Sequence, residues 1–189
     1  MADFGGARKW ARKIIEENLF PGAKAIDATM GNGYDTVWMA EAVGETGRVY
    51  AFDVQALALE RTREKLMETG LDTRAELFLM GHENMALAVK CEIDAIVFNL
   101  GWLPGADKEK RTKPDTTLSA VNQALELLKP GGVLTICVYP GHDEGKREKE
   151  TLVSWAEALD DGVFDAVIFR YANIKKLPPL LIAVTKRAK

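Results

Sequence analysis

Residues 25–33 read Ala-Ile-Asp-Ala-Thr-Met-Gly-Asn-Gly, a short apolar segment that runs into a glycine turn. Apolar residues at positions 37, 39, 40 and 43 follow, so this stretch predicts a strand, a turn and a helix in succession. The same order returns about five times along the chain. Strand–helix alternation of this kind is typical of a parallel sheet with helices on both faces.

The remaining elements extend this pattern in both directions. Strands are predicted at 25–29, 48–52, 75–80, 93–98, 133–138, 163–171 and 180–186, and helices at 7–18, 35–43, 56–68, 84–90, 116–128 and 145–159. Fewer than ten residues join the last two strands, which is too short for a parallel crossover, so these two are expected to be antiparallel. The predicted fold class is a doubly wound α/β fold with a reversed edge region, and its ligand is expected outside the carboxyl ends of the strands.

Composition limits the class of protein. The chain has 189 residues, 47% apolar and 28% charged, with a net charge of −3, so a single globular domain over residues 1–189 is expected. Disordered, collagen-like, low-complexity and coiled-coil proteins are excluded. No apolar run reaches the ~18 residues of a membrane helix, and the first ten residues do not resemble a secretory signal, so no membrane partner is expected. Cys91 and Cys137 lack partners at metal-ligand spacing, which favours a reduced cytoplasmic protein without a metal site.

Acidic residues flank the glycine turn. Asp27 precedes it, and Asp53 lies 20 residues after Gly33 at the end of the next strand. Thr36 stands in the place of the third glycine of the dinucleotide fingerprint, which disfavours a nicotinamide-dependent oxidoreductase. A carboxylate at Asp53 can accept both hydroxyls of a ribose, and this suits S-adenosylmethionine; the alternative is a solvated strand end. The ammonium of the methionine moiety is expected near Asp27, and its carboxylate near the helix that starts at Asp35.

The end of the fourth strand, Asn99-Leu100-Gly101-Trp102, has a pattern analogous to the Asn-Pro-Pro-aromatic motif of amino-group methyltransferases, with Leu-Gly in place of Pro-Pro. The amide oxygen of Asn99 can accept a hydrogen bond from a substrate N–H group and so orient the nitrogen lone pair toward an electrophilic methyl group. Trp102 can stack on a planar base; the alternative is hydrophobic filler at the start of a loop.

Both histidines of the chain also follow strands. His82 is expected to contact the adenine of the cofactor. His142, in Tyr139-Pro-Gly-His142, is the candidate proton acceptor, because histidine titrates near neutral pH; the alternative is a loop residue that orients Tyr139 or the 101–115 loop. The predicted catalytic residues are Asn99, Trp102, Tyr139 and His142. The predicted cofactor-binding residues are Asp27, Thr29, Gly31, Asn32, Gly33, Asp35, Thr36, Asp53, Val54, Gln55, His82, Glu83 and Asn99.

Charged residues on the loops of the functional edge show a small basic excess. Ten are basic (Lys108, Lys110, Arg111, Lys113, Lys146, Arg147, Lys149, Arg170, Lys175, Lys176) and seven are acidic (Asp107, Glu109, Asp115, Asp143, Glu144, Glu148, Glu150). Basic side chains of this kind can reach RNA phosphates, and the alternative is an ordinary solvated rim.

Six motifs together resemble the bacterial "putative rRNA methylase" family, in a match that runs from about residue 10 to the C-terminus. They are Asp-Ala-Thr-Met-Gly-Asn-Gly-Tyr-Asp-Thr at 27–36, Phe-Asp-Val-Gln at 52–55, Gly-His-Glu-Asn at 81–84, Phe-Asn-Leu-Gly-Trp-Leu-Pro at 98–104, Lys-Pro-Asp-Thr-Thr at 113–117 and Tyr-Pro-Gly-His at 139–142. The resemblance implies a class I S-adenosylmethionine-dependent methyltransferase, with a mostly parallel seven-stranded sheet whose last strand is antiparallel.

The resemblance also implies a substrate. Characterised relatives methylate the amine of 5-aminomethyl(-2-thio)uridine at the tRNA wobble position, so the expected partner is RNA, a tRNA anticodon stem-loop. Tyr34 stands where the family usually has His, Trp102 where Tyr is common, and Ile174 and Lys176 replace two amides. Ribosomal RNA and a small-molecule amine stay open as alternative acceptors. An apolar edge around the final strands makes a homodimer reasonable.

Overall fold

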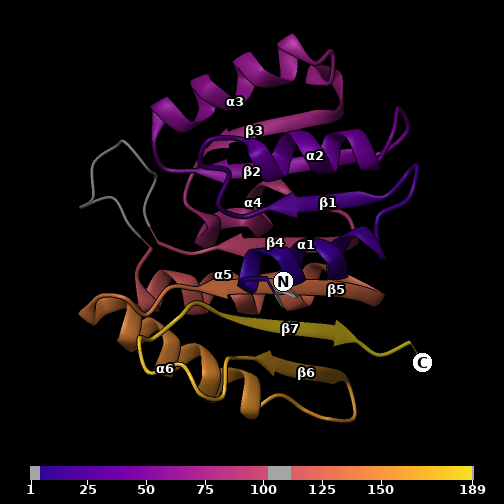
Figure 1. Cartoon of the computed structure of the whole chain (residues 1–189). Coiled ribbons are helices and arrows are strands. Elements are labelled where there is room, and N and C mark those ends of the chain that lie inside the picture. Colours follow the sequence, from indigo (N-terminus) through magenta and orange to yellow (C-terminus); the bar gives the residue numbers. More distant parts are fainter. Residues whose placement is uncertain (1–4, 102–111, 189) are drawn as a thin grey trace.

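The structure, a computed structural model, describes residues 5–101 and 112–188. Its centre is a seven-stranded sheet with the order β3-β2-β1-β4-β5-β7-β6 (Figure 1). The strands are β1 (Lys24–Asp27), β2 (Arg48–Asp53), β3 (Ala75–Leu79), β4 (Ile93–Asn99), β5 (Leu128–Val138), β6 (Phe164–Phe169) and β7 (Leu180–Lys186). Neighbouring strands among β1 to β5 pair in parallel, and β7 is antiparallel to both of its neighbours.

The reversed edge region predicted from the sequence differs in one respect from the structure. Only β7 is reversed, and it lies between β5 and β6, so the edge strand β6 runs parallel to β1–β5. Burial explains this placement. The first five residues of β7 are all buried, as in a strand with neighbours on both sides, whereas β6 has four exposed residues out of six. Strand β6 exposes Val167 and Phe169, the apolar edge on which the expectation of a homodimer depends.

Helices cover both faces of the sheet. They are α1 (Ala7–Glu16), α2 (Tyr34–Ala42), α3 (Ala56–Glu68), α4 (Met85–Ala88), α5 (Pro114–Leu127) and α6 (Asp143–Glu157), with short 3₁₀ helices at Asp72–Arg74 and His82–Asn84. Helices α1–α3 pack on small strand residues such as Ala25, Val49 and Ala95, and α4–α6 pack on the large side chains of the opposite face, including Ile26, Phe52 and Phe98. The predicted class, a doubly wound and mostly parallel sheet with an antiparallel last strand, is confirmed.

Two loop features position the functional edge. Gly33, the N-cap of α2, has φ +79°, and a Cβ atom there would lie 2.9 Å from the Cα of Thr62 in α3. Glycine at this position therefore allows α2 and α3 to approach closely, directly after the turn that follows β1. Helix α6 begins two residues earlier than predicted, because the Nδ1 atom of His142 caps it by accepting a hydrogen bond from the backbone N–H of Gly145.

None of the helices in the described part of the chain combines the length and the apolar character that crossing a lipid bilayer requires.

Candidate active site

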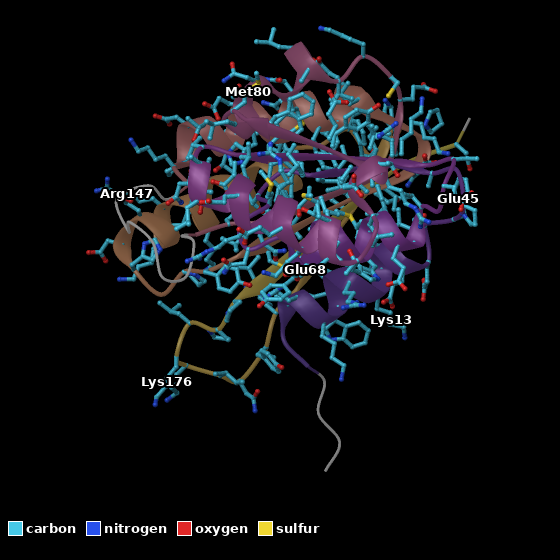
Figure 2. The ribbon with its side chains drawn as sticks, turned by 90° about the horizontal axis from the view of Figure 1, so that it is seen from above. Lys13, Glu45, Glu68, Met80, Arg147 and Lys176 are labelled. Carbon is cyan, nitrogen blue, oxygen red and sulfur yellow. The ribbon has the colours of Figure 1, made fainter. Side chains whose placement is uncertain are left out.

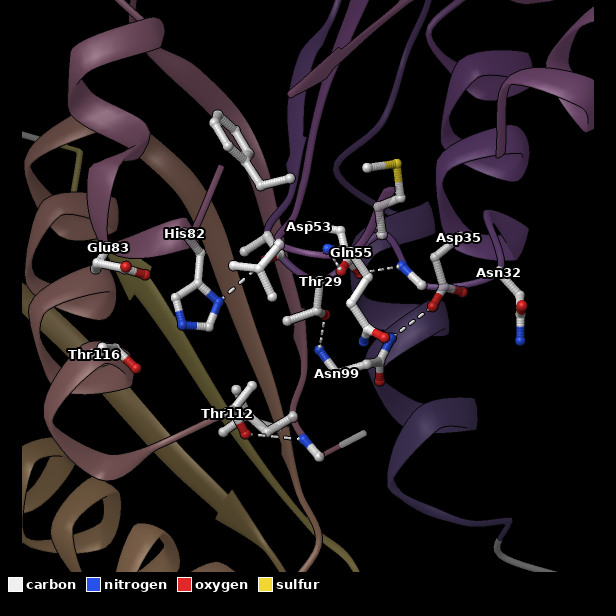
Figure 3. Close-up of a pocket in the computed structure, with 18 of the residues that line it drawn as sticks. Thr29, Asn32, Asp35, Asp53, Gln55, His82, Glu83, Asn99, Thr112 and Thr116 are labelled. Atoms are coloured by element: carbon white, nitrogen blue, oxygen red, sulfur yellow. Dashed lines mark hydrogen bonds between the residues drawn. The ribbon is translucent and has the colours of Figure 1, made fainter. Parts of the chain in front are cut away.

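A cavity of about 720 Å³ opens at the carboxyl edge of the parallel strands. It lies between the segments that follow β1, β2, β3 and β4 (Figure 3). Arg8 of α1, Thr116 of α5 and Tyr139 after β5 complete its wall. A volume of this size falls within the range of roughly 300–1,000 Å³ that is typical of sites for small molecules and cofactors. The rule that ligands bind outside the carboxyl ends of such strands therefore applies to this sheet.

Most of the residues predicted to form the site line this cavity. They are Thr29, Gly31, Asn32, Asp35, Asp53, Val54, Gln55, His82, Glu83, Asn99 and Tyr139. Four others, Asp27, Gly33, Thr36 and His142, are not among the lining residues. Trp102 lies outside the described residues, as do Asp107, Lys108, Glu109, Lys110 and Arg111.

Asp27 lies beneath the cavity rather than in its wall. Its carboxylate is fully buried and accepts hydrogen bonds from the hydroxyl of Thr36 at 2.7 Å and from the backbone N–H of Thr29 at 3.2 Å. Burial, followed by the charge of Asp35, raises the pKa of Asp27 to about 7. Asp27 therefore ties α2 to the end of β1, and its expected contact with the ammonium of a methionine moiety stays a prediction.

Thr36 explains why a threonine replaces the third glycine of the dinucleotide fingerprint. Its side chain is fully buried and its hydroxyl donates to Asp27, so this position serves the anchoring of α2 on β1 and makes no direct contact with the cavity. The requirement for glycine is instead met three residues earlier, at Gly33.

Asp53 joins the glycine turn to the end of β2. Its Oδ2 accepts from the backbone N–H of Gly31 at 3.0 Å, and its Oδ1 accepts from the backbone N–H of Gln55 at 2.9 Å. Burial raises the pKa of Asp53, and these backbone hydrogen bonds partly oppose the rise. Each oxygen keeps a further lone pair, so a carboxylate held in this way can accept hydrogen bonds from a diol in the cavity.

His82 is neutral and held in one tautomer. Burial lowers its pKa, and its Nδ1 lies 3.2 Å from the carbonyl oxygen of Ala28. Because a carbonyl oxygen only accepts, Nδ1 carries the proton and Nε2 is left as an acceptor. Gln123 of α5 fixes the adjoining segment: its Nε2 donates to the carbonyl of Glu83, and its Oε1 accepts from the N–H of Ala86.

Asn99 is held from two sides. Its backbone N–H donates to the hydroxyl of Thr29 at 2.7 Å, and its Nδ2 donates to Oδ2 of Asp35 at 2.6 Å (Figure 3). The same carboxylate oxygen lies 3.4 Å from Nη2 of Arg8, which α1 brings to the cavity. The Oδ1 atom of Asn99 is buried and has no hydrogen-bond partner among the described residues. A buried amide oxygen without a partner is unfavourable unless a ligand completes it.

Tyr139 and His142 lie at different places relative to the cavity. Tyr139 lines the cavity, and burial raises the pKa of its hydroxyl to about 12, so it is a neutral donor or acceptor. His142 uses Nδ1 to cap α6 and is not among the lining residues. The ring of His142 therefore caps the helix that follows it, and its role as a proton acceptor stays a prediction.

Sequence reasoning did not name Arg8 as part of the wall, and it named Lys113 only among the basic residues of the functional edge. In the sequence Arg8 belongs to the basic face of the first helix, and nothing local indicates that α1 lies beside α2. Lys113 directly precedes Pro114, the first residue of α5, and this boundary between loop and helix is the signal that could have found it. No group of three or more potential metal ligands occurs within the two described segments.

Comparison with known proteins adds independent information. Residues 49–185 match a family described as "Putative rRNA methylase". The tRNA (mnm(5)s(2)U34)-methyltransferase, chloroplastic, of Arabidopsis thaliana is 35% identical over 96% of this chain and 69% of its own length. The ubiquinone/menaquinone biosynthesis C-methyltransferase UbiE of Klebsiella pneumoniae is 31% identical over 72% of this chain, and the match spans 51% of that protein.

Solved structures agree with these matches. A "putative rRNA-methylase" from Clostridium thermocellum superimposes with a TM-score of 0.95 at 36% identity, over 98% of this chain and 100% of that one. A "putative methyltransferase" from Streptococcus mutans, solved in complex with SAH, gives a TM-score of 0.88 at 37% identity, over 97% and 99% of the two chains.

Proposed function

The chain belongs to the rRNA methylase family and is an S-adenosylmethionine-dependent methyltransferase, and from this premise we propose that it methylates the amine of a 5-aminomethyl(-2-thio)uridine at the wobble position of a tRNA. Two parts of this proposal go beyond the family: the acceptor atom is an amine nitrogen, and the acceptor molecule is a tRNA. The first is supported by the geometry at Asn99, and the second by the Arabidopsis relative named for that substrate.

The cavity fits S-adenosylmethionine. Asp53 offers carboxylate oxygens for the ribose hydroxyls, and the Nε2 acceptor of His82 suits the amino group of an adenine. Asp35, rather than Asp27, is the carboxylate that lines the cavity at the start of α2, where it can receive the ammonium of the methionine moiety. When bound, the cofactor supplies a methyl group on a sulfonium, which is open to attack by a nitrogen lone pair.

The observation that carries the amine assignment is the orientation of the Asn99 amide. Its Nδ2 is committed to Asp35, and this leaves Oδ1, which has no partner among the described residues, as the remaining hydrogen-bond acceptor of the amide. An incoming amine has N–H groups to donate, whereas a carbon nucleophile has none. The bond to Oδ1 would direct the nitrogen lone pair away from Asn99 and toward the methyl group, and orientation of this kind is worth up to about 7–11 kcal/mol in well-aligned reactions.

Charge supports the same assignment. The positive charge moves from sulfur to nitrogen as the methyl group is transferred, so a carboxylate close to the nitrogen favours the transition state. Asp35 is hydrogen-bonded to the amide that binds the amine in this proposal. The amine must also be neutral when it attacks, although alkylamines have pKa values of about 10. The arrangement therefore predicts a rate that rises with pH as the free amine becomes more abundant.

Features of the rim support an RNA acceptor. Lys113 reaches the cavity wall, and Figure 2 shows Arg147 and Lys176 on the side of the molecule where the parallel strands end. In this proposal these side chains meet phosphates while a splayed-out base enters the cavity, as is usual when single-stranded loops are recognised. The exposed aromatic Tyr34 also lines the opening, with Nζ of Lys65 5.0 Å from its ring centroid.

The test is transfer of labelled methyl from S-adenosylmethionine to three acceptors: tRNA that carries the aminomethyl precursor, the same tRNA without it, and ribosomal RNA. Labelling of the first alone is expected, and nuclease digestion should place the label on the wobble nucleoside. Labelling of ribosomal RNA alone, or equal labelling of both tRNAs, would contradict the proposal. A free aminomethyl uridine nucleoside methylated as efficiently as the tRNA would identify a small-molecule enzyme instead.

A further inference from the structure

A buried carboxylate lies behind one wall of the cavity. Glu148 is 3% exposed and occupies the inward face of α6 together with Gly145, Leu152 and Ala156. An apolar side chain is the usual choice at such a position. Within the described segments the carboxylate of Glu148 accepts hydrogen bonds from threonine hydroxyls and forms no ion pair with a lysine or arginine. A buried carboxylate is unfavourable unless hydrogen bonds compensate for its lost hydration, so a specific use for this one is to be expected.

Two threonines hold the carboxylate of Glu148. Its Oε1 accepts from the hydroxyl of Thr117 in α5 at 2.7 Å, and its Oε2 accepts from the hydroxyl of Thr112 at 3.2 Å. Burial raises the pKa of Glu148, and these two hydrogen bonds and the nearby His142 oppose the rise. The two threonines differ in their surroundings: Thr117 is fully buried within α5, whereas Thr112 lines the cavity.

Thr112 connects Glu148 to the segment at the end of β4. Its hydroxyl oxygen accepts from the backbone N–H of Gly101 at 3.0 Å, and its own N–H donates to the carbonyl of Gly101 at 3.0 Å (Figure 3). Gly101 has φ +123°, a conformation that side chains other than glycine rarely adopt, and it lies two residues after Asn99. The hydroxyl of Thr112 donates its hydrogen bond to the carboxylate of Glu148, so a lone pair of its oxygen stays available for the N–H of Gly101.

We propose that Glu148 is a positioning residue for methyl transfer: acting through Thr112, it holds Gly101 and the segment from Asn99 to Gly101 in the place that the acceptor requires. The inference rests on the proposed function, because Asn99 defines the acceptor side of the cavity there. The cofactor contacts proposed above lie on the segments after β1, β2 and β3, so loss of this link is expected to affect turnover and to spare cofactor binding.

The first experiment compares kcat for labelled methyl transfer to precursor tRNA with the Kd for S-adenosylmethionine. Glu148→Ala and Thr112→Val should each lower kcat roughly 10- to 100-fold, the effect expected of a displacement of about 1 Å, while Kd changes less than about twofold. Glu148→Gln should restore most of kcat, because its amide oxygen can accept from Thr112 while its NH₂ group donates to Thr117. The double variant of Glu148→Ala with Thr112→Val should be no slower than either single variant, as for two residues in one chain of hydrogen bonds.

Thr117→Val is the matched control. It removes a hydrogen bond to the same carboxylate, but Thr117 has no contact with Gly101, so kcat should stay near the wild-type value even if the melting temperature falls. Glu150→Gln tests an exposed glutamate of the same helix. If kcat falls in Thr117→Val as much as in Thr112→Val, or follows the melting temperature across all variants, then Glu148 has only a structural role and the proposal is overturned.

A second readout does not depend on the acceptor. Amide hydrogen exchange at Gly101 should be faster in Glu148→Ala and Thr112→Val than in the wild type, and unchanged in Thr117→Val. Unaltered exchange in the first two variants would overturn the link between Glu148 and Gly101. If instead the wild-type enzyme labels no precursor tRNA but exchange at Gly101 responds as expected, the proposed substrate is contradicted, whereas the link between Glu148 and Gly101 is supported.

Discussion

The hydroxyl of Thr36 donates a 2.7 Å hydrogen bond to Oδ2 of Asp27, and neither side chain is exposed to solvent. The bond joins the first turn of α2 to the end of β1 beneath the cavity. Since Asp35 and Asp53 also interact with Asp27, three carboxylates share this small region, and its electrostatics should depend on pH.

The stability of the protein should fall as pH rises through the range in which Asp27 ionises. Its pKa is raised from 3.8 to about 7 in the folded state. Between these values the folded chain retains a proton that the unfolded chain has released, so the free energy of unfolding decreases with pH over this window. Asp27→Asn should make the free energy of unfolding less dependent on pH in this window. Urea unfolding between about pH 4.5 and about pH 8 measures this dependence. The same change at exposed Asp72 is the control; a profile equally steep in Asp27→Asn would contradict the raised pKa.

Replacement of Asp53 should weaken cofactor binding. Its carboxylate is already held by the N–H groups of Gly31 and Gln55, so in the proposed complex it would meet the ribose without reorganisation. Hydrogen bonds to charged groups contribute about 1.5–3 kcal/mol, so Asp53→Ala should raise the Kd of S-adenosylmethionine roughly 10- to 150-fold in calorimetry. Asp72→Asn should leave it unchanged. An unaltered Kd would remove Asp53 from the site, and tighter binding of NADH than of S-adenosylmethionine would contradict the proposed cofactor site.

Asn99→Ala should reduce turnover far more than cofactor affinity. In the proposed complex Oδ1 accepts a hydrogen bond from the N–H group of the substrate amine, and this bond contributes mainly in the transition state, so kcat is expected to fall by about 100-fold or more. Asp35→Asn should also lower kcat, because it removes the carboxylate that fixes the Asn99 amide at 2.6 Å. Asn18→Ala, at the distant end of α1, serves as the control. Steady-state kinetics with unchanged kcat in Asn99→Ala would exclude the proposed orientation of the amine.

A Cβ atom at Gly33 should separate α2 from α3. The position has φ +79°, and the new atom would lie 2.6 Å from Oγ1 of Thr62. Left-handed backbone costs a non-glycine residue about 1–2 kcal/mol, and overpacking adds about 1–3 kcal/mol. Gly70→Ala measures the cost of the left-handed backbone alone, since Gly70 has φ +68° and a Cβ atom there would meet nothing within 4 Å. Chemical unfolding should show a larger loss of stability for Gly33→Ala; equal losses would mean that the helices adjust freely.

RNA binding should weaken with salt through the basic residues of the rim. Lys113→Glu, Lys175→Glu and Lys176→Glu in combination should raise the KM for tRNA and reduce the slope of log affinity against log salt by somewhat under one for each phosphate that is no longer neutralised. The Kd for S-adenosylmethionine should not change in calorimetry. Lys24→Glu, at the amino end of β1 on the opposite edge of the sheet, is the control. A combined variant that binds tRNA as tightly as the wild type would place the RNA elsewhere.

Much of the fold follows from patterns within short stretches of sequence. Alternating strands and amphipathic helices, glycine turns and the short connection before the last strand predict the doubly wound sheet and its antiparallel strand, because burial imposes a period on each element separately. The glycine turn near residue 31, the carboxylate at 53 and the amide at 99 are found in the same way, since parallel strands bring their carboxyl ends to one edge.

Other features depend on partners far apart in the sequence, and the tertiary structure alone decides them. The position of β7 inside the sheet results from burial on both faces and not from the length of its connection. The sequence does not indicate that Asp27 is enclosed by Thr36, or that Asp35 lies against an amide 64 residues away. Glu148 stands among charged residues in the sequence, although the spacing of Gly145, Leu152 and Ala156 places it on the buried face of α6. A residue type shows which hydrogen bonds a side chain can form, but packing determines which of them are already taken, and those that remain are available to the ligand.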